Sequence, residues 1–256
     1  MLLGAAIGDI IGSRFEFNNY RQTDFDLFTP ESRFTDDTVC TVAIAEWVLH
    51  GCHDDLVSIM QRWCRRYMGC GFGDNFMRWA LNDDPQPYNS YGNGAAMRVS
   101  PVGWAFSTLD DTLSYATASA AITHNHPEGI KGAQATAAAI YLARNGSDKE
   151  AIKNKITDYF AYDLEKNCDT IRLDYEFNES CQGTVPQAVT AFLESHDFEH
   201  AMRLAVSLGG DSDTLAAITG SIAEAYYSEI PTSIQAQAIE RLPAEMLDVL
   251  SLLPQA

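Results

Sequence analysis

Residues 209–227 read GGDSDTLAAITGSIAEAYY, and this stretch decides the fold. A glycine-rich, acidic turn leads into an apolar segment whose larger side chains recur every three or four residues, at Leu215, Ile218, Ile222 and Tyr226. This spacing lines one face of an α-helix, whereas in a strand every second residue shares a face. We therefore expect a helix after Asp213, with the polar turn at its amino end.

The same periodicity dominates the rest of the chain. A second apolar helix is expected from about Asp36, with one face formed by Val39, Val42, Ala43 and Trp47. Convincing strand alternation is absent, and turn residues fall between the periodic segments. The sequence therefore predicts an all-α protein, with further helices at about 54–68, 94–106, 110–122, 128–145, 148–160, 184–195, 197–208 and 232–252.

Length and composition favour one compact domain over residues 1–256. Of the 256 residues, 46% are hydrophobic, which is enough apolar material for one continuous core and argues against global disorder. The chain has no internal repeat and no low-complexity linker. Its least regular stretch, residues 161–183, is expected to be either a surface loop beside a pocket or an ordinary connector.

Acidic residues outnumber basic ones by a wide margin. Asp and Glu total 35 against 17 Lys and Arg, which gives a formal net charge of -18. This charge repels a phosphate backbone, so no stable nucleic-acid binding is expected. Carboxylates that converge repel one another and resist ionisation. A divalent cation relieves that repulsion, so we expect a metal wherever several acids meet.

Cysteine usage and the amino-terminal segment bear on the compartment. None of the six cysteines belongs to a CxxC pair, and several lie in apolar helical patterns, as expected of reduced thiols in the cytoplasm. Residues 1–12, MLLGAAIGDIIG, lack a basic lead and carry Asp9, so they match neither a signal peptide nor a membrane span. We predict a cytoplasmic protein with no membrane partner.

Two turns rich in short oxygen side chains precede the two strongest helices. In the first, Thr35, Asp36 and Asp37 have the residue types of a helix cap and first turn, and also of oxygen ligands for a hard cation. In the second turn, residues 209–214, helix capping accounts for one of the oxygen side chains but hardly for all of them. Two such helix ends facing each other would make an oxygen cage large enough for two metals.

Residues 4–16 combine small residues at helical spacing with an isolated acid. Glycines four residues apart on a helix usually mark close packing against another helix, and they occur here at Gly4, Gly8 and Gly12. Glu16 stands between two phenylalanines, and an acid in aromatic surroundings either faces solvent or serves a function. The residues themselves leave both readings of Glu16 open.

Two further motifs contain groups that bind anions or metals. Residues 90–98, SYGNGAAMR, form a glycine-rich turn that opens a helix. Backbone N–H groups in such a turn can hold a phosphate, although the same glycines also serve ordinary turns. The pair His124 and His126 could bind a metal, but paired histidines more often donate hydrogen bonds or have structural roles.

These five motifs, in this order, resemble the ADP-ribosylglycohydrolase family, which includes dinitrogenase reductase-activating glycohydrolases and ADP-ribosyl-acceptor hydrolases. The matching runs are GAAIGDIIGSRFE, TDDT, SYGNGAAMR, the TH of THNHP, and GGDSDT, and SCQGTVPQA resembles a further block of bacterial members. The resemblance implies an all-helical fold with a central cleft for two magnesium ions, or manganese in some members. It also implies an ADP-ribose conjugate, such as an ADP-ribosylated protein, as substrate.

The resemblance assigns roles to residues of this chain by position. The implied metal ligands are Thr35, Asp36, Asp37, Asp211, Asp213 and Thr214, with Asp213 best placed to bridge two ions. The implied catalytic residues are Glu16 and Asp37. The implied diphosphate and adenosine side consists of Ser90, Tyr91, Gly92, Asn93 and Gly94, with His124 as a phosphate-side histidine.

The expected reaction is hydrolysis of the bond between ADP-ribose and its acceptor. A dimetal site can grip the vicinal hydroxyls of ribose and activate a water. Breaking the bond develops positive charge on the ribose ring, which nearby carboxylates stabilise. Whether Glu16 activates the water, or coordinates metal and gates entry, stays open, as does the acceptor: arginine, serine, O-acetyl-ADP-ribose or modified nucleic acid.

Two other functions compete with this one. The chain could be a catalytically inactive ADP-ribose binder or a structural relative, although Glu16 and all six candidate ligands are present. It could also be a dimetal phosphohydrolase in which the same cage acts on the diphosphate. The product separates the last reading from ours, because cleavage of the diphosphate releases AMP.

Overall fold

Helix α13, Ser212–Tyr227, lies at the centre of the molecule, and its residues from Ser212 to Ala225 are all buried. The computed structural model describes residues 1–253. A helix that is buried on every side needs neighbours all round it. The helices packed against α13 include α1 (Gly4–Gly12), α8 (Pro127–Arg144), α11 (Cys181–Glu194) and α12 (Phe198–Ser207). The apolar periodicity of residues 215–226 therefore marks the core of the fold.

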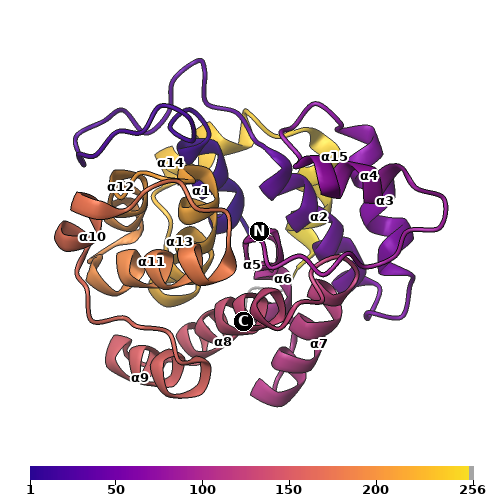
Figure 1. Ribbon diagram of the computed structural model, residues 1–256. Helices are drawn as coiled ribbons and strands as arrows, with labels where there is room; N and C mark the ends of the chain where they lie inside the picture. The colour runs from indigo at the N-terminus through magenta and orange to yellow at the C-terminus, as the bar shows by residue number, and fades with distance from the viewer. Residues whose placement is uncertain (254–256) are drawn as a thin grey trace.

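Several of the remaining helices lie in two groups, at the left and at the right of Figure 1. Beside α11 and α12 lies α10 (Cys168–Asp174), and α2 (Asp36–Leu49), α3 (Leu56–Arg66), α4 (Asp74–Leu81) and α15 (Ala244–Leu252) lie on the opposite side. The others are α5 (Gly94–Met97), α6 (Ser100–Ala105), α7 (Leu109–Ala121), α9 (Lys149–Phe160) and α14 (Thr232–Ile239). Residues 1–253 contain no strand, only an isolated antiparallel bridge between Gly92 and Ser180, so the predicted all-α class is confirmed. None of these helices has the length and apolar character needed to cross a membrane.

The glycines of α1 let this helix pack directly on the backbone of α13. A Cβ on Gly8 would lie 2.0 Å from the carbonyl oxygen of Ala216, and one on Gly12 would lie 2.4 Å from Cα of Asp213. The expected close helix packing is thus confirmed. Because the end of α1 touches the start of α13, Glu16, four residues beyond Gly12, lies beside the acidic turn.

A buried glutamate fixes the other end of the same helix pair. The backbone N–H groups of Leu3 and Gly4 donate to the two carboxylate oxygens of Glu224 on α13, at 2.9 and 2.8 Å. No side chain of its own N-cap residue caps α1. Glu224 therefore satisfies amide groups that would otherwise be left unpaired at the start of a buried helix.

We expect Gly8→Ala to destabilise the protein strongly. The added methyl group overlaps the Ala216 carbonyl, so α1 and α13 must move apart, and overpacking of this kind costs about 1–3 kcal/mol or more. The measurement is urea unfolding of Gly8→Ala beside Gly69→Ala, since nothing lies within 4 Å of a Cβ on Gly69. Equal free energies of unfolding for the two variants would contradict the close packing.

Proline interrupts two helices that were predicted as continuous. The segment predicted at 94–106 divides into α5 and α6, with Pro101 in the first turn of α6. The segment predicted at 232–252 divides into α14 and α15, with Pro243 as the N-cap of α15. Proline lacks the N–H needed in a helix interior and clashes with the preceding turn, so each predicted helix breaks there.

Two short helices were not predicted. Helix α4 buries Phe76, Trp79 and Ala80, and α10 lies inside the irregular stretch 161–183, capped by the Asn167 side chain, which accepts from the Thr170 N–H. Each spans about two turns, too short for apolar periodicity to stand out. The end of that stretch does border a cavity, because Glu179 lines it.

Candidate active site

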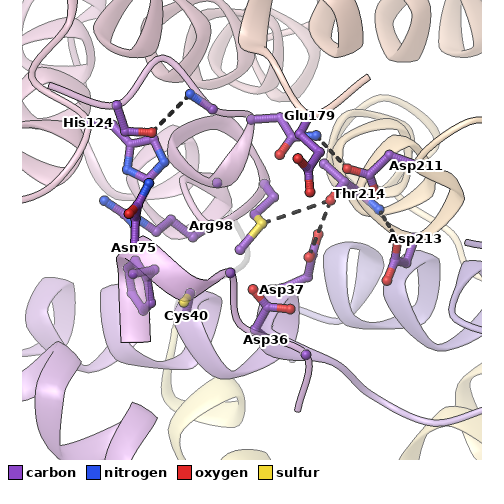
Figure 2. A pocket seen from close by; sticks show the side chains of 18 of the residues that line it. Asp36, Asp37, Cys40, Asn75, Arg98, His124, Glu179, Asp211, Asp213 and Thr214 are labelled. Carbon is purple, nitrogen blue, oxygen red and sulfur yellow. Dashed lines mark hydrogen bonds between the residues drawn. The ribbon is translucent and has the colours of Figure 1, made fainter. Parts of the chain in front are cut away.

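A cavity of about 410 Å³ opens where α2 and α13 begin. Its walls come from five parts of the chain: the segment after α1, the first turn of α2, residues 71–76, residues 88–98, and the start of α13, with His124 and Glu179 completing it. In Figure 2 the acids of α2 and α13 lie at one end and His124 and Arg98 at the other. The cavity thus has an acidic end and an end with nitrogen donors.

The first turn of α2 supplies two of the acids. Asp36 and Asp37 line the cavity, and Thr214 on α13 donates from its hydroxyl to Asp37 Oδ2 at 3.4 Å, linking the two helix ends. Thr35 is the N-cap residue of α2, and its side chain accepts from the Asp37 N–H. The Thr35 hydroxyl donates to Asp9 Oδ1 at 2.7 Å, and Thr35 is not among the lining residues.

The carboxylate of Asp9 holds this turn in place through hydrogen bonds. The carboxylate is fully buried in α1 and also accepts from the backbone N–H groups of Thr35 and Thr38, at 2.8 and 3.1 Å, and from the Thr38 hydroxyl. Burial raises the pKa of Asp9 to about 6, although these hydrogen bonds oppose the shift. This role of Asp9 was not predicted, although an acid inside a small, apolar helix is a signal for it.

The start of α13 supplies the remaining acids. Gly209 and Gly210 have φ of +77° and +71°, a left-handed conformation that glycine adopts freely, and they reverse the chain just before Asp211. Asn93 Nδ2 donates to Asp211 Oδ2 at 2.7 Å and so ties this turn to the glycine-rich loop. Asp211, Asp213 and Thr214 all line the cavity, as their positions after the two glycines predict.

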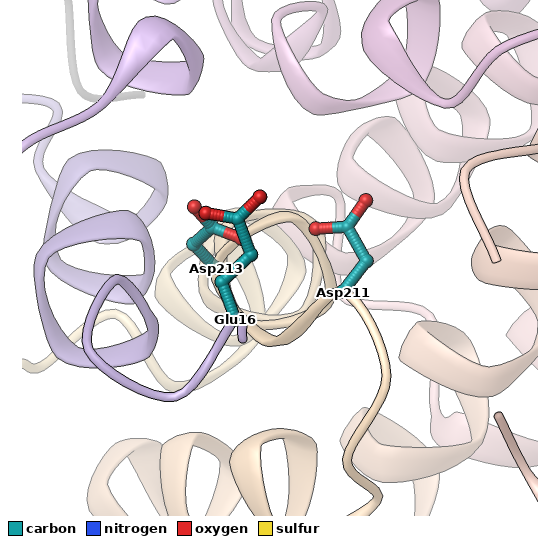
Figure 3. Close-up of side chains that lie close together, drawn as sticks. All are labelled: Glu16, Asp211 and Asp213. Atoms are coloured by element: carbon teal, nitrogen blue, oxygen red, sulfur yellow. The ribbon is translucent and has the colours of Figure 1, made fainter. Parts of the chain in front are cut away.

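Glu16 meets these acids from the other side. One carboxylate oxygen from each of Glu16, Asp211 and Asp213 lies within 4.8 Å of the others (Figure 3). Burial, followed by the negative charge of Asp211, raises the pKa of Glu16 to about 7. Glu16 is half-buried and faces the acid cluster, so the solvent-facing reading does not describe it.

The acidic end has the chemistry of a hard-cation site. Burial and neighbouring carboxylates raise the pKa values of Asp36, Asp37 and Asp213 well above their usual range. Asp37 Oδ1 is buried and has no hydrogen-bond partner among the residues described. Crowded, ionisable oxygens with an unpaired acceptor are what a divalent cation requires, so the cluster can bind a metal ion.

The glycine-rich loop forms the wall next to His124. Ser90, Gly92, Asn93 and Gly94 line the cavity. Two backbone N–H groups are already engaged, since Gly92 donates to Ser90 Oγ at 3.1 Å and Asn93 to the Glu179 carbonyl at 2.7 Å. These two amides are therefore not free to hold a phosphate in the way the sequence suggested.

Tyr91 and the two histidines take separate positions. Tyr91 is 53% exposed, lies outside the lining, and packs edge-on against the His126 ring, with the ring centroids 5.4 Å apart. His126 is the N-cap of α8 and accepts from the Glu128 N–H, whereas the His124 ring lies in the cavity wall with Nδ1 beside Thr123. The two histidines therefore have different roles and do not form a metal-binding pair.

Several lining residues were not predicted individually from the sequence. Asn75 and Phe76 come from the unpredicted helix α4, Tyr88 precedes the glycine loop, and Glu179 follows α10. Arg98 ends the glycine-rich motif and was assigned no role, but its side chain is fully buried in the wall. Their participation depends on how distant segments pack, which local patterns do not reveal.

The whole described chain matches one family. The family model for ADP-ribosylglycohydrolase covers residues 1–253, and the chain belongs to the ADP-ribosylglycohydrolase family. The ADP-ribosylhydrolase ARH3 of Mus musculus is 26% identical over 314 residues, covering 91% of this chain and 85% of the relative. The ADP-ribosylarginine hydrolase Tri1 of Pseudomonas putida (strain GB-1) is 27% identical over 292 residues, covering 96% and 76%. A solved ADP-ribosylglycohydrolase-related protein complex shares the fold with a TM-score of 0.74 and 27% identity, covering 97% of this chain and 93% of that one.

Proposed function

We propose that this protein hydrolyses the bond between ADP-ribose and its acceptor, with two magnesium ions held at the acidic end of the cavity. The observation that carries the proposal is the convergence of Glu16 with Asp211 and Asp213 beside Asp36 and Asp37. The other end of the cavity offers Ser90, Gly94 and His124 to a diphosphate, since the Gly92 and Asn93 amides are already engaged. The names of the relatives ARH3 and Tri1 also describe hydrolases of ADP-ribosyl groups.

The proposed ligands are Asp36, Asp37, Asp211, Asp213 and Thr214, with Thr35 retained from the family pattern. Magnesium bound there would orient the ribose hydroxyls and lower the pKa of a water. Without a cation, the acids would repel an anionic diphosphate, because Arg98 is the only cationic side chain among the lining residues described. Charge balance alone therefore makes substrate binding depend on the metal.

The protein residues orient the substrate and move a proton. Glu16 lies beside Asp211 and Asp213, where the anomeric carbon is expected, and its raised pKa suits proton transfer near neutral pH. Asp37, on the opposite wall, would stabilise positive charge on the ribose ring. A water adds to the anomeric carbon as the bond to the acceptor breaks, and the acceptor leaves with a proton. Phe17 lines the cavity, and its exposed ring stacks on that of Phe177 with the centroids 6.0 Å apart.

The function is tested by incubating the protein with ADP-ribosylated arginine, ADP-ribosylated serine and O-acetyl-ADP-ribose, with magnesium or with chelator. Free ADP-ribose as the product, formed only with the metal, is the expected result. AMP as the product would instead support a phosphohydrolase. Tight ADP-ribose binding without turnover of any substrate would support an inactive binder.

We expect Tyr91→Ala to weaken ADP-ribose binding several-fold while changing turnover less. The ring lies at the edge of the glycine loop and is half exposed, so a purine can pack on its free face. Calorimetry with ADP-ribose measures the dissociation constant, and Tyr159→Ala serves as the control because Tyr159, on α9, is exposed to a similar extent. An unaltered dissociation constant for Tyr91→Ala would leave this tyrosine a structural role only.

A further inference from the structure

A chain of three side chains leads from the core to the cavity. Arg98 lies between α5 and α6 and is fully buried. Its Nη2 donates to the Ser119 carbonyl at 2.9 Å and to the Thr123 hydroxyl oxygen at 2.8 Å. Its Nε and Nη1 have no hydrogen-bond partner in residues 1–253. Burying a cation with unpaired donors costs free energy of folding. The hydrogen bond to Thr123 is one of the two that Arg98 makes among the described residues.

Thr123 relays this contact to the adjacent histidine. Its hydroxyl oxygen accepts a hydrogen bond from Arg98, which leaves the hydroxyl proton available for donation to another group. His124 Nδ1 lies 2.7 Å from that oxygen, and no other acceptor for the hydroxyl is present in the part of the chain that the structure describes. Nδ1 is thus the acceptor at hand for the hydroxyl proton, and this pairing favours the ring tautomer that is unprotonated at Nδ1.

The opposite nitrogen of the ring faces the glycine loop. A Cβ on Gly94 would lie 3.1 Å from His124 Nε2, and one on Gly92 would lie 3.4 Å from it, so glycine at these positions leaves room beside Nε2. In residues 1–253, Nε2 has no hydrogen-bond partner. Burial, together with the positive charge of Arg98, lowers the pKa of His124 well below its usual value, which keeps the ring neutral.

We propose that Arg98 and Thr123 are positioning residues that fix His124 as the tautomer protonated on Nε2, so that it presents a neutral N–H donor to an anionic oxygen of the substrate. The other tautomer would turn a lone pair towards that oxygen and repel it. With Nε2 protonated in the neutral ring, the donor is present without any need for the ring to carry a charge. The substrate part of this inference rests on the proposed function, whereas the tautomer itself does not.

The test uses 15N-labelled protein and three variants. Imidazole 15N shifts report which ring nitrogen carries the proton, and His124→Gln assigns the signals of His124 among the six histidines. Thr123→Val removes the hydroxyl at nearly constant shape, and Thr123→Ser restores it. Thermal melting shows that each variant is folded. ADP-ribose affinity is measured by calorimetry with magnesium.

We expect the Nε2–H form in wild type and in Thr123→Ser, both with the same dissociation constant. In Thr123→Val the proton should shift towards Nδ1, and the dissociation constant should rise about tenfold, the scale of one lost hydrogen bond to a charged group. An Nδ1–H form in wild type would overturn the proposal without any variant. A change of tautomer without weaker binding, or weaker binding without a change of tautomer, would also overturn it. If wild type does not bind ADP-ribose at all, the proposed function fails, and the tautomer is still decided.

Discussion

Glu16→Gln should lower turnover by about 100-fold or more, the scale of a lost general acid or base. The substitution keeps the shape of the side chain and removes its charge at the point where Glu16 meets Asp211 and Asp213. Affinity for ADP-ribose should survive, because the glycine loop, His124 and the acids of α2 and α13 remain. The measurement is turnover of an ADP-ribosylated substrate together with the dissociation constant of ADP-ribose in the same variant.

Magnesium titration separates the two roles of Glu16. If Glu16 transfers a proton, the lost turnover should not return at any magnesium concentration. If it is instead a metal ligand, high magnesium should restore much of the turnover. Glu165→Gln is the control, because it removes an exposed carboxylate that does not line the cavity. Near-normal turnover of Glu16→Gln at saturating magnesium would remove Glu16 from the mechanism.

Chelation should abolish turnover and lower the melting temperature. A cation that binds only the folded state adds about 2.7 kcal/mol of stability at 100 times its dissociation constant. For a chain of this length that corresponds to a rise of roughly 5–10 °C. Thermal melting with magnesium and with chelator measures the difference, and Asp213→Asn should remove most of it. The surface variant Asp163→Asn should keep the difference, because Asp163 is exposed.

The stabilisation by magnesium should also grow with pH. Without metal, the folded-state pKa values of Asp36, Asp37 and Asp213 lie above 3.8, the value for an unperturbed aspartate. Between the unfolded and folded pKa values the folded state holds more protons, so the metal-free protein loses stability as pH rises through that window. Magnesium replaces those protons. Its effect on the melting temperature should therefore be larger at pH 7.5 than at pH 5, and an effect independent of pH would contradict a carboxylate cage.

Local sequence patterns predicted most of the helices and the glycine contacts of α1. The spacing of Leu215, Ile218 and Ile222 could be read without partners, because helical periodicity is a property of the segment itself. Short helices escaped this reading, since α4 and α10 each span only about two turns. The helix breaks at Pro101 and Pro243 could have been predicted from the sequence, because proline is disfavoured in a helix interior.

The sequence by itself determined the all-helical class, the acids that open α2 and α13, and, through motif resemblance, the family. Only the tertiary structure decided that Glu16 faces Asp211 and Asp213. It also decided that Asp9 accepts a hydrogen bond from Thr35 and that Tyr91 lies outside the cavity lining. It also decided the contact from Arg98 through Thr123 to His124. The physical reason is how far apart along the chain the interacting residues lie. Capping and periodicity act within a few residues, whereas Asn93 donates to Asp211 across 118 positions, and such contacts exist only once the helices have packed.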